Sequence, residues 1–146
     1  MAIPVVFVGH GGYAKGVRDA VRMILGEQPS LGVVSLPPNG STEQLAEQVR
    51  AELVRLGAAG PADGGTIGEA LVLADLFGGS PANAVGALAL RNPALHLVSG
   101  LNLPMALEVL TSAETTAAAL AEVAATAGRD GVLDVAARLR AAVKGS

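Results

Sequence analysis

This sequence predicts a three-layer α/β fold, with a mostly parallel central sheet and helices on both faces. Short apolar runs alternate with segments of helical periodicity four times along the chain. Strands joined by crossover helices form parallel sheets of this kind. In addition, 51% of the residues are hydrophobic and only 2% are aromatic. The core must therefore be built from Ala, Val, Leu and Ile, as in strands buried on both faces.

The composition also limits the classes of function. The 146 residues predict a single domain, residues 1–146, with a flexible end at 141–146. The net charge of −3 and the scarcity of aromatic residues exclude a nucleic-acid surface, and the absence of cysteine excludes disulfides and thiolate chemistry. Because no apolar run is long enough for a membrane span or a signal peptide, we expect a cytoplasmic protein.

The first half of the chain contains two strand–helix units. Residues 3–9 form a continuous apolar strand, and the helix after it ends at Gly26. Residues 31–36 form a second strand, which turn residues follow. Ser41, with a glutamine three residues later, forms a capping box that opens a helix closed by Gly57.

The third unit follows a loop at 58–68. Residues 69–75 form an apolar strand. Ser80 is expected to be the N-cap of the next helix, with Pro81 at its first position, and this helix runs to about Arg91.

The fourth unit begins with a strand at 95–100, and a helix starts at about Pro104. Residues 114–127 are expected to be helical up to Gly128. The tail at 131–143 is ambiguous, because it could open as a strand and continue as a helix.

Four loops follow the expected strands and define where a ligand would bind. In parallel sheets, ligands lie beyond the carboxyl ends of the strands. The loops are residues 9–12, 37–41, 75–81 and 99–104, and His10 and Asp75 each stand directly at a strand end.

His10 alone leaves four interpretations open: a structural histidine, a metal ligand, part of an oxyanion loop, or a phosphate-carrying nucleophile. The glycines beside it leave the imidazole accessible, and a glycine loop before a helix offers N–H groups to an anion. If Asp75 accepts a hydrogen bond from Nδ1, it fixes the tautomer and leaves Nε2 bare as a nucleophile. Gly78 and Gly79 permit close approach of a ligand, and Ser80 begins a helix whose dipole favours an anion.

Several alternatives compete with this interpretation. Each residue by itself could be structural: Asp75 a turn cap, Gly78 and Gly79 a tight turn, Ser80 a helix start. A serine hydrolase would use His10, Asp75 and Ser80, but the chain has no G-x-S-x-G motif and is short for that fold. Neither glycine loop matches a nucleotide-binding motif. A metal site lacks a carboxylate cluster beside His10, and His96 stands in mid-strand.

Four motifs occur in one order along nearly the whole chain: "GHGGYAKG" from Gly9, "MILGEQ" at 23–28, "DLFGGSPANA" at 75–84 and "SGLNLPMALE" at 99–108, with "AGRDGV" at 127–132 near the end. Together they resemble the IIA component of the mannose/fructose class of the sugar phosphotransferase system. The residues at 37–41 match only loosely.

The resemblance implies a phosphocarrier without a metal or another cofactor. The histidine matching His10 accepts a phosphoryl group from phospho-HPr and passes it to a IIB component, for sugar uptake and phosphorylation. The aspartate matching Asp75 orients that histidine. The phosphate is expected to contact the residues that match Leu76, Phe77, Gly78, Gly79, Ser80 and Gly11.

The resemblance also implies partners. We expect a separate IIB protein that links the chain to a membrane permease, without direct insertion of this chain. A homodimer is expected, formed by exchange of an antiparallel edge strand at about 131–135. Two related roles stay open: a regulatory component without a dedicated permease, and the phosphodonor subunit of a dihydroxyacetone kinase.

Overall fold

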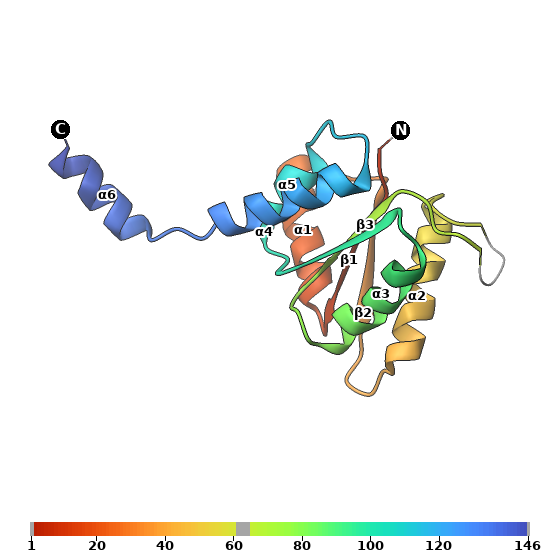
Figure 1. Ribbon diagram of the computed structural model, residues 1–146. Coiled ribbons are helices and arrows are strands. Elements are labelled where there is room, and N and C mark those ends of the chain that lie inside the picture. The colour runs from red at the N-terminus through yellow and green to blue at the C-terminus, as the bar shows by residue number, and fades with distance from the viewer. Residues whose placement is uncertain (1, 61–64, 146) are drawn as a thin grey trace.

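The computed structural model describes residues 2–60 and 65–145 and contains a four-stranded parallel sheet. The strand order is β2-β1-β3-β4, so β1 and β3 occupy the centre. Helices cover both faces of the sheet, as Figure 1 shows. The predicted α/β fold class is confirmed. The strands are β1 (Val5–His10), β2 (Leu31–Leu36), β3 (Ala70–Ala74) and β4 (Leu95–Ser99).

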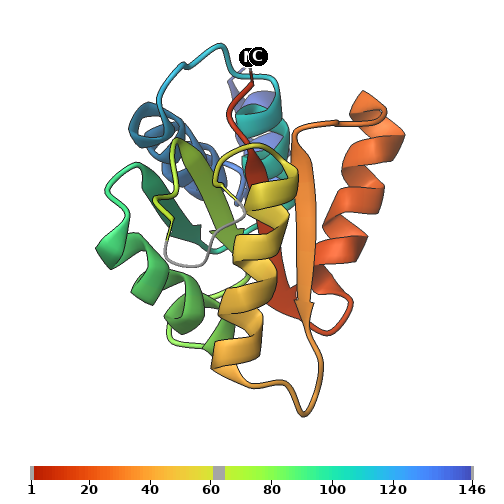
Figure 2. The same ribbon diagram turned by 90° about the vertical axis from the view of Figure 1, so that its right-hand side faces the viewer.

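Two apolar clusters, one on each face, hold the layers together. α2 (Thr42–Arg55) and α3 (Ser80–Arg91) contribute residues to one cluster, and Figure 2 shows α2 in front of the strands. α1 (Tyr13–Leu25), α4 (Leu103–Leu110) and α5 (Ala117–Asp130) contribute to the other. Because side chains alternate along a strand, β1 sends Val6 and Val8 to the first cluster and Val5 and Phe7 to the second.

Most predicted helix ends lie where the sequence placed them. The capping box at Ser41 is present, with Ser41 Oγ accepting from the Gln44 N–H at 3.1 Å. Ser80 is different: Gly79 is the N-cap of α3, and Ser80 is already the first helical residue. The extended backbone of Gly79 (φ −90°, ψ 169°) takes the cap position one residue earlier than predicted.

The C-terminal region differs more from the prediction. α5 continues through Gly128 and ends at Asp130, because Gly128 is buried against Met105 and Asn102 instead of turning the chain. The residues at 132–134 are non-helical, and α6 (Val135–Lys144) follows them.

The expected antiparallel edge strand at about 131–135 does not form within the described chain. A strand needs an adjacent sheet edge, and in the expected exchange that edge belongs to a second copy. The exchange therefore stays a prediction. The predicted loop at 58–68 lies partly outside the described residues; at its ends, Ala59 and Ile67 form an isolated antiparallel bridge. None of the described helices is long and apolar enough to span a membrane.

Candidate functional site

His10 is the last residue of β1 and stands at the carboxyl edge of the sheet. The five residues before it in the strand are buried, whereas the His10 side chain is 48% exposed. The strand therefore fixes the backbone of His10 rigidly and leaves its imidazole open to solvent. This is the accessible position that the sequence predicted.

Asp75 follows the adjacent strand β3 and lies directly beside His10. Its Oδ2 accepts two hydrogen bonds from His10, one from the ring Nδ1 at 2.7 Å and one from the backbone N–H at 2.9 Å. Its Oδ1 accepts from the Leu76 N–H at 2.9 Å. The parallel pairing of β1 with β3 places the two residues together, since the Asp75 N–H donates to the Val8 carbonyl at 3.0 Å.

These contacts determine the charge on Asp75. Burial raises the pKa of its carboxyl, but the hydrogen bonds from the His10 N–H and ring, the charge interaction with His10 and the bond from the Leu76 N–H outweigh burial and hold that pKa below its ordinary value. An ionised carboxylate can only accept hydrogen bonds, so Nδ1 of His10 carries the proton in this pair. In the neutral imidazole, Nε2 is then the bare nitrogen.

Two glycines leave room for this pair. A Cβ at Gly79 would lie 3.0 Å from Cε1 and 3.5 Å from Nε2 of His10. A Cβ at Gly9 would lie 3.3 Å from Oδ2 of Asp75. The imidazole and the carboxylate therefore sit in a slot between two backbone segments, and a side chain at either position would displace them.

The loop between Asp75 and α3 supplies unused backbone donors beside the imidazole. Across the described chain, the N–H groups of Phe77, Gly78, Gly79 and Ser80 donate no hydrogen bond. Gly78 adopts φ +88°, a backbone conformation that favours glycine, and it turns the loop into the helix. Unpaired N–H groups at the start of a 12-residue helix suit an anion.

Two of the predicted phosphate-contacting residues have their N–H groups already occupied. Leu76 donates to Asp75, as described above, and the Gly11 N–H donates to the Leu36 carbonyl at 3.1 Å. Leu76 therefore supports the carboxylate, and Gly11, with φ +51°, shapes the turn after His10. The family resemblance that suggested these two residues does not reveal which N–H groups already donate within the chain.

The other two strand-end loops have structural roles in this chain. Ser41 caps α2, and Asn102 caps α4 by accepting from the Met105 N–H at 2.9 Å. The sequence analysis missed one link between the loops: the Tyr13 hydroxyl donates to the Leu101 carbonyl at 2.5 Å. Tyr13 is the chain's only tyrosine and lies three residues after His10, which is a signal that could have pointed to it.

The geometry does not assemble a hydrolase triad or a metal centre. Within residues 2–60 and 65–145, no hydrogen bond joins Ser80 to His10, and no group of three or more His, Asp or Glu side chains could hold a metal ion. His96 lies in β4, which pairs with β3 on the side away from β1.

Comparison with known proteins identifies similar sequences among the IIA components of the sugar phosphotransferase system. The model of the "PTS system fructose IIA component" family matches residues 4–127. The sorbose-specific EIIA component of Lacticaseibacillus casei is 32% identical over 109 residues, which are 75% of this chain and 72% of that protein. The mannose-specific EIIAB component of Escherichia coli K12 is 31% identical over 90% of this chain, but the match spans only 39% of that longer protein.

Solved structures agree in fold over almost the full chain. The mannose/sorbose-specific IIA subunit from Enterococcus faecalis has a TM-score of 0.78 at 28% identity, covering 91% of this chain and 94% of its own. The EIIA component from Streptococcus agalactiae has a TM-score of 0.80 at 25% identity, covering 92% and 98%. The chain belongs to the family of mannose- and fructose-type IIA components of the sugar phosphotransferase system.

Proposed function

We propose that this IIA component carries a phosphoryl group on Nε2 of His10, accepting it from phospho-HPr and passing it to a IIB component that serves sugar uptake. The observation that carries the proposal is the 2.7 Å hydrogen bond between Nδ1 of His10 and Oδ2 of Asp75. This bond leaves Nε2 as the free nitrogen of a half-exposed imidazole.

The transfer needs one bond made and one broken. The lone pair of Nε2 attacks phosphorus, and a P–N bond forms as the bond from phosphorus to the donor atom of phospho-HPr breaks on the opposite side. The imidazole gains positive charge during attack, and the ionised Asp75, hydrogen-bonded to Nδ1–H, stabilises that charge. The reverse sequence delivers the phosphoryl group to IIB.

The phosphoryl oxygens need donors on the side of the imidazole away from Asp75. The unused N–H groups of the loop from Phe77 to Ser80 are suited to this role, and a Cβ at Gly79 would lie 3.5 Å from Nε2. Fixed backbone donors lose little entropy when they bind an anion, so positioning and electrostatics account for the chemistry.

The surface around His10 fits contact with other proteins. The side chains of Leu76 and Phe77, 47% and 87% exposed, flank the site with apolar area. Exposed apolar groups around an accessible reactive atom are typical of a transient protein interface. We infer that HPr and IIB bind this same surface in turn, and that residues 1–146 act as one IIA domain.

The direct test is a phosphorylation assay. The full chain is incubated with phosphoenolpyruvate, enzyme I and HPr, and protein-bound phosphate is measured. We expect an acid-labile, alkali-stable phosphate on the wild-type chain and on His96→Ala, which alters the other histidine. His10→Ala should carry none.

Two results would contradict the proposal: no phosphate on a folded wild-type chain, or an undiminished label on His10→Ala. A label that moved to His96 would contradict the assignment of the site. Circular dichroism on each variant shows that the fold is retained.

A further inference from the structure

Tyr13 carries a hydroxyl near the site that the reaction described above does not use. It is the first residue of α1 and follows His10 by three positions. Tyr13 is 46% exposed, yet its hydroxyl reaches the loop between β4 and α4 and donates to the Leu101 carbonyl. The two residues are 88 positions apart in the sequence, so this bond joins two loops that are distant along the chain.

The Leu101 peptide is itself held against the strand end that carries Asp75. Leu101 is 2% exposed in the second apolar cluster, and its N–H donates to the Ala74 carbonyl at 2.9 Å. Ala74 is the last residue of β3 and directly precedes Asp75. Leu101 therefore holds the end of β3 with its N–H and accepts from Tyr13 with its carbonyl.

These bonds close a ring that includes the catalytic pair. From His10 the chain passes through two glycines to Tyr13, whose hydroxyl crosses to Leu101. From Leu101 the ring continues to the end of β3, and Asp75 completes it through the 2.7 Å bond to Nδ1 of His10. Each hydrogen bond in such a network restricts the groups that make the others. Opening the bond at Tyr13 should therefore give the whole ring more freedom.

The two glycines after His10 make the hydroxyl bond important for the imidazole. A Cβ at Gly11 or Gly12 would meet nothing within 4 Å, so neighbouring groups do not confine this segment tightly. Gly12 is also the N-cap of α1, and it has no side chain to bond the first turn. Because glycine has the widest choice of backbone angles, the segment needs a contact that restricts it. In the described chain, the Tyr13 bond is the first side-chain hydrogen bond after His10.

We propose that Tyr13 is a positioning residue for phosphoryl transfer, whose hydroxyl bond to Leu101 keeps His10 and Asp75 aligned for the reaction. The inference rests on the proposed function, because alignment matters only if His10 reacts. Tyr13 acts through the two loops that it joins and does not need to touch the phosphoryl group. A misplacement of about 1 Å can slow a reaction by about a hundredfold, and the loss of one bond in the ring should permit a smaller one.

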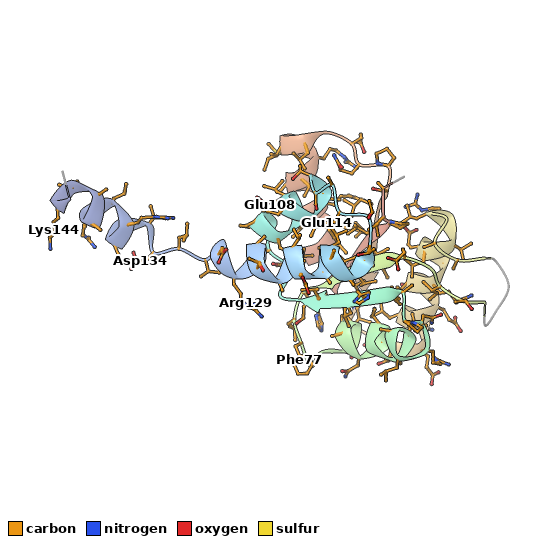
Figure 3. The ribbon with its side chains drawn as sticks, turned by 45° about the horizontal axis from the view of Figure 1, so that its top comes forward. Phe77, Glu108, Glu114, Arg129, Asp134 and Lys144 are labelled. Atoms are coloured by element: carbon orange, nitrogen blue, oxygen red, sulfur yellow. The ribbon has the colours of Figure 1, made fainter. Side chains whose placement is uncertain are left out.

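Phe77 is the other exposed aromatic residue beside the site, and its surroundings differ. Figure 3 shows it projecting from the loop before α3, and it is 87% exposed. Its side chain has no polar atom, so it cannot form a bond like that of Tyr13. We expect Phe77 to contribute to the docking of a partner, whereas Tyr13 contributes to alignment after docking. The two aromatic side chains therefore form a useful pair for kinetic comparison.

The first experiment follows transfer from phospho-HPr to the full chain by rapid quench, over a range of phospho-HPr concentrations. Tyr13→Phe removes only the hydroxyl, and it should lower the maximal rate constant about three- to tenfold with an unchanged half-saturating concentration. Phe77→Ala should instead raise the half-saturating concentration. The matched control is Thr111→Val at the C-terminal end of α4, which removes a hydroxyl that donates to the Leu107 carbonyl at 2.7 Å. This control should transfer as wild type.

Three kinetic results would overturn the positioning role. The rate constant of Tyr13→Phe could equal that of wild type. Thr111→Val could slow transfer as much as Tyr13→Phe, which would show a general effect of losing a hydroxyl bond. Tyr13→Phe could raise only the half-saturating concentration, which would make Tyr13 a contact residue for the donor protein.

A double-mutant cycle tests whether Tyr13 acts through the catalytic pair. If it does, Tyr13→Phe should slow transfer much less in an Asp75→Ala chain than in wild type, because the alignment is already lost there. Equal factors in the two backgrounds would show that Tyr13 acts independently of Asp75 and would contradict the proposed ring.

The last measurement uses no phosphate donor, so it separates this inference from the proposed function. NMR of the His10 ring nitrogens in the unphosphorylated chain reports the tautomer, and exchange of the Nδ1 proton with water reports the bond to Asp75. Tyr13→Phe should speed this exchange about threefold or more, and Thr111→Val should leave it unchanged. A wild-type chain that accepts no phosphate would contradict the proposed function alone. Equal proton exchange in Tyr13→Phe and wild type would contradict the positioning role, even in a chain that is phosphorylated.

Discussion

The strand-end site and the C-terminal arm, residues 131–145, lie in the same small molecule but are stabilised in opposite ways. At the site, one carboxylate accepts three hydrogen bonds within the chain, and buried strands fix the backbone on both sides. In the arm, apolar side chains face solvent, and α6 has no buried residue. The contacts between His10 and Asp75 are made within one chain, whereas α6 buries none of its residues in that chain.

This difference fits two requirements of a phosphocarrier. The reacting nitrogen must keep one orientation while it meets two proteins in turn, so its support has to come from its own chain. An assembly contact has no such requirement and can be supplied entirely by a partner. Substitutions at the site should therefore change rates without changing assembly, and substitutions in the arm should do the opposite.

The largest expected effect comes from removing the carboxylate. Asp75→Ala leaves Nδ1 and the backbone N–H of His10 without their acceptor, so the tautomer and the ring orientation are no longer fixed. We expect phosphoryl transfer from phospho-HPr to slow by about a hundredfold or more. The measurement is the rate of phosphate incorporation, with the circular dichroism spectrum as the control for folding. A normal rate in a folded Asp75→Ala chain would show that the carboxylate does not orient His10.

A smaller effect is expected from filling the slot beside the imidazole. A Cβ at Gly79 would lie 3.0 Å from Cε1 of His10, so Gly79→Ala should displace the ring and slow transfer about tenfold. The matched control is Gly86→Ala in α3, where a Cβ meets nothing within 4 Å. That variant should transfer normally and gain about 0.5–1 kcal/mol of stability from helix propensity. NMR spectra of the His10 ring nitrogens should change in the first variant only, and equal rates in the two would contradict the role of the slot.

The stability of the site should also depend on pH. The pKa of the Asp75 carboxyl is below its ordinary value in the folded chain, because the hydrogen bonds and charge of His10 outweigh the effect of burial. A depressed carboxyl pKa stabilises the fold above the unfolded-state value of about 4, and this contribution is lost as the pH falls through the lower folded-state pKa.

Urea unfolding of wild type and Asp75→Asn measures this contribution. The difference in free energy of unfolding should be greatest near neutral pH and should shrink as the pH falls below about 4. A difference that stayed constant with pH would show that ionisation of Asp75 does not contribute. Leu139→Asp, in the arm, should leave the shape of the wild-type profile near neutral pH unchanged.

The two regions also differ in how far the sequence predicts them. The pairing of Asp75 with His10 is predictable from the order of strands and loops, because adjacent parallel strands bring their carboxyl ends together. The sequence does not predict which ring nitrogen of His10 faces Asp75, or that the N–H groups of Leu76 and Gly11 already donate hydrogen bonds within the chain. These contacts depend on backbone and side-chain angles within the loops, which residue types do not specify. The N-cap of α3 lies at Gly79 instead of Ser80 for the same reason.

The end of α5 shows a second kind of limit. Gly128 is a common helix-ending residue, yet here it is buried beside Met105 and the helix continues to Asp130. Tertiary packing overrides the local preference at this position. The tail after it is ambiguous between strand and helix in the sequence, and in the structure residues 132–134 are non-helical and α6 follows them.

The smallest effect is expected in α6, where shortening one apolar side chain should scarcely change the stability of the single chain. Leu139→Ala removes a side chain that is 63% exposed, so at concentrations where the chain is monomeric the free energy of unfolding should change by less than about 0.5 kcal/mol. Leu120→Ala in α5, where the side chain is 4% exposed in the second apolar cluster, should cost about 2–5 kcal/mol. Urea unfolding measures both. Suppose that in dilute protein Leu139→Ala lowered the free energy of unfolding nearly as much as Leu120→Ala. In that case α6 would be packed against its own chain in solution. If the loss of unfolding free energy at Leu139 grew with protein concentration, it would come from a contact between molecules, because only such a contact makes stability depend on concentration.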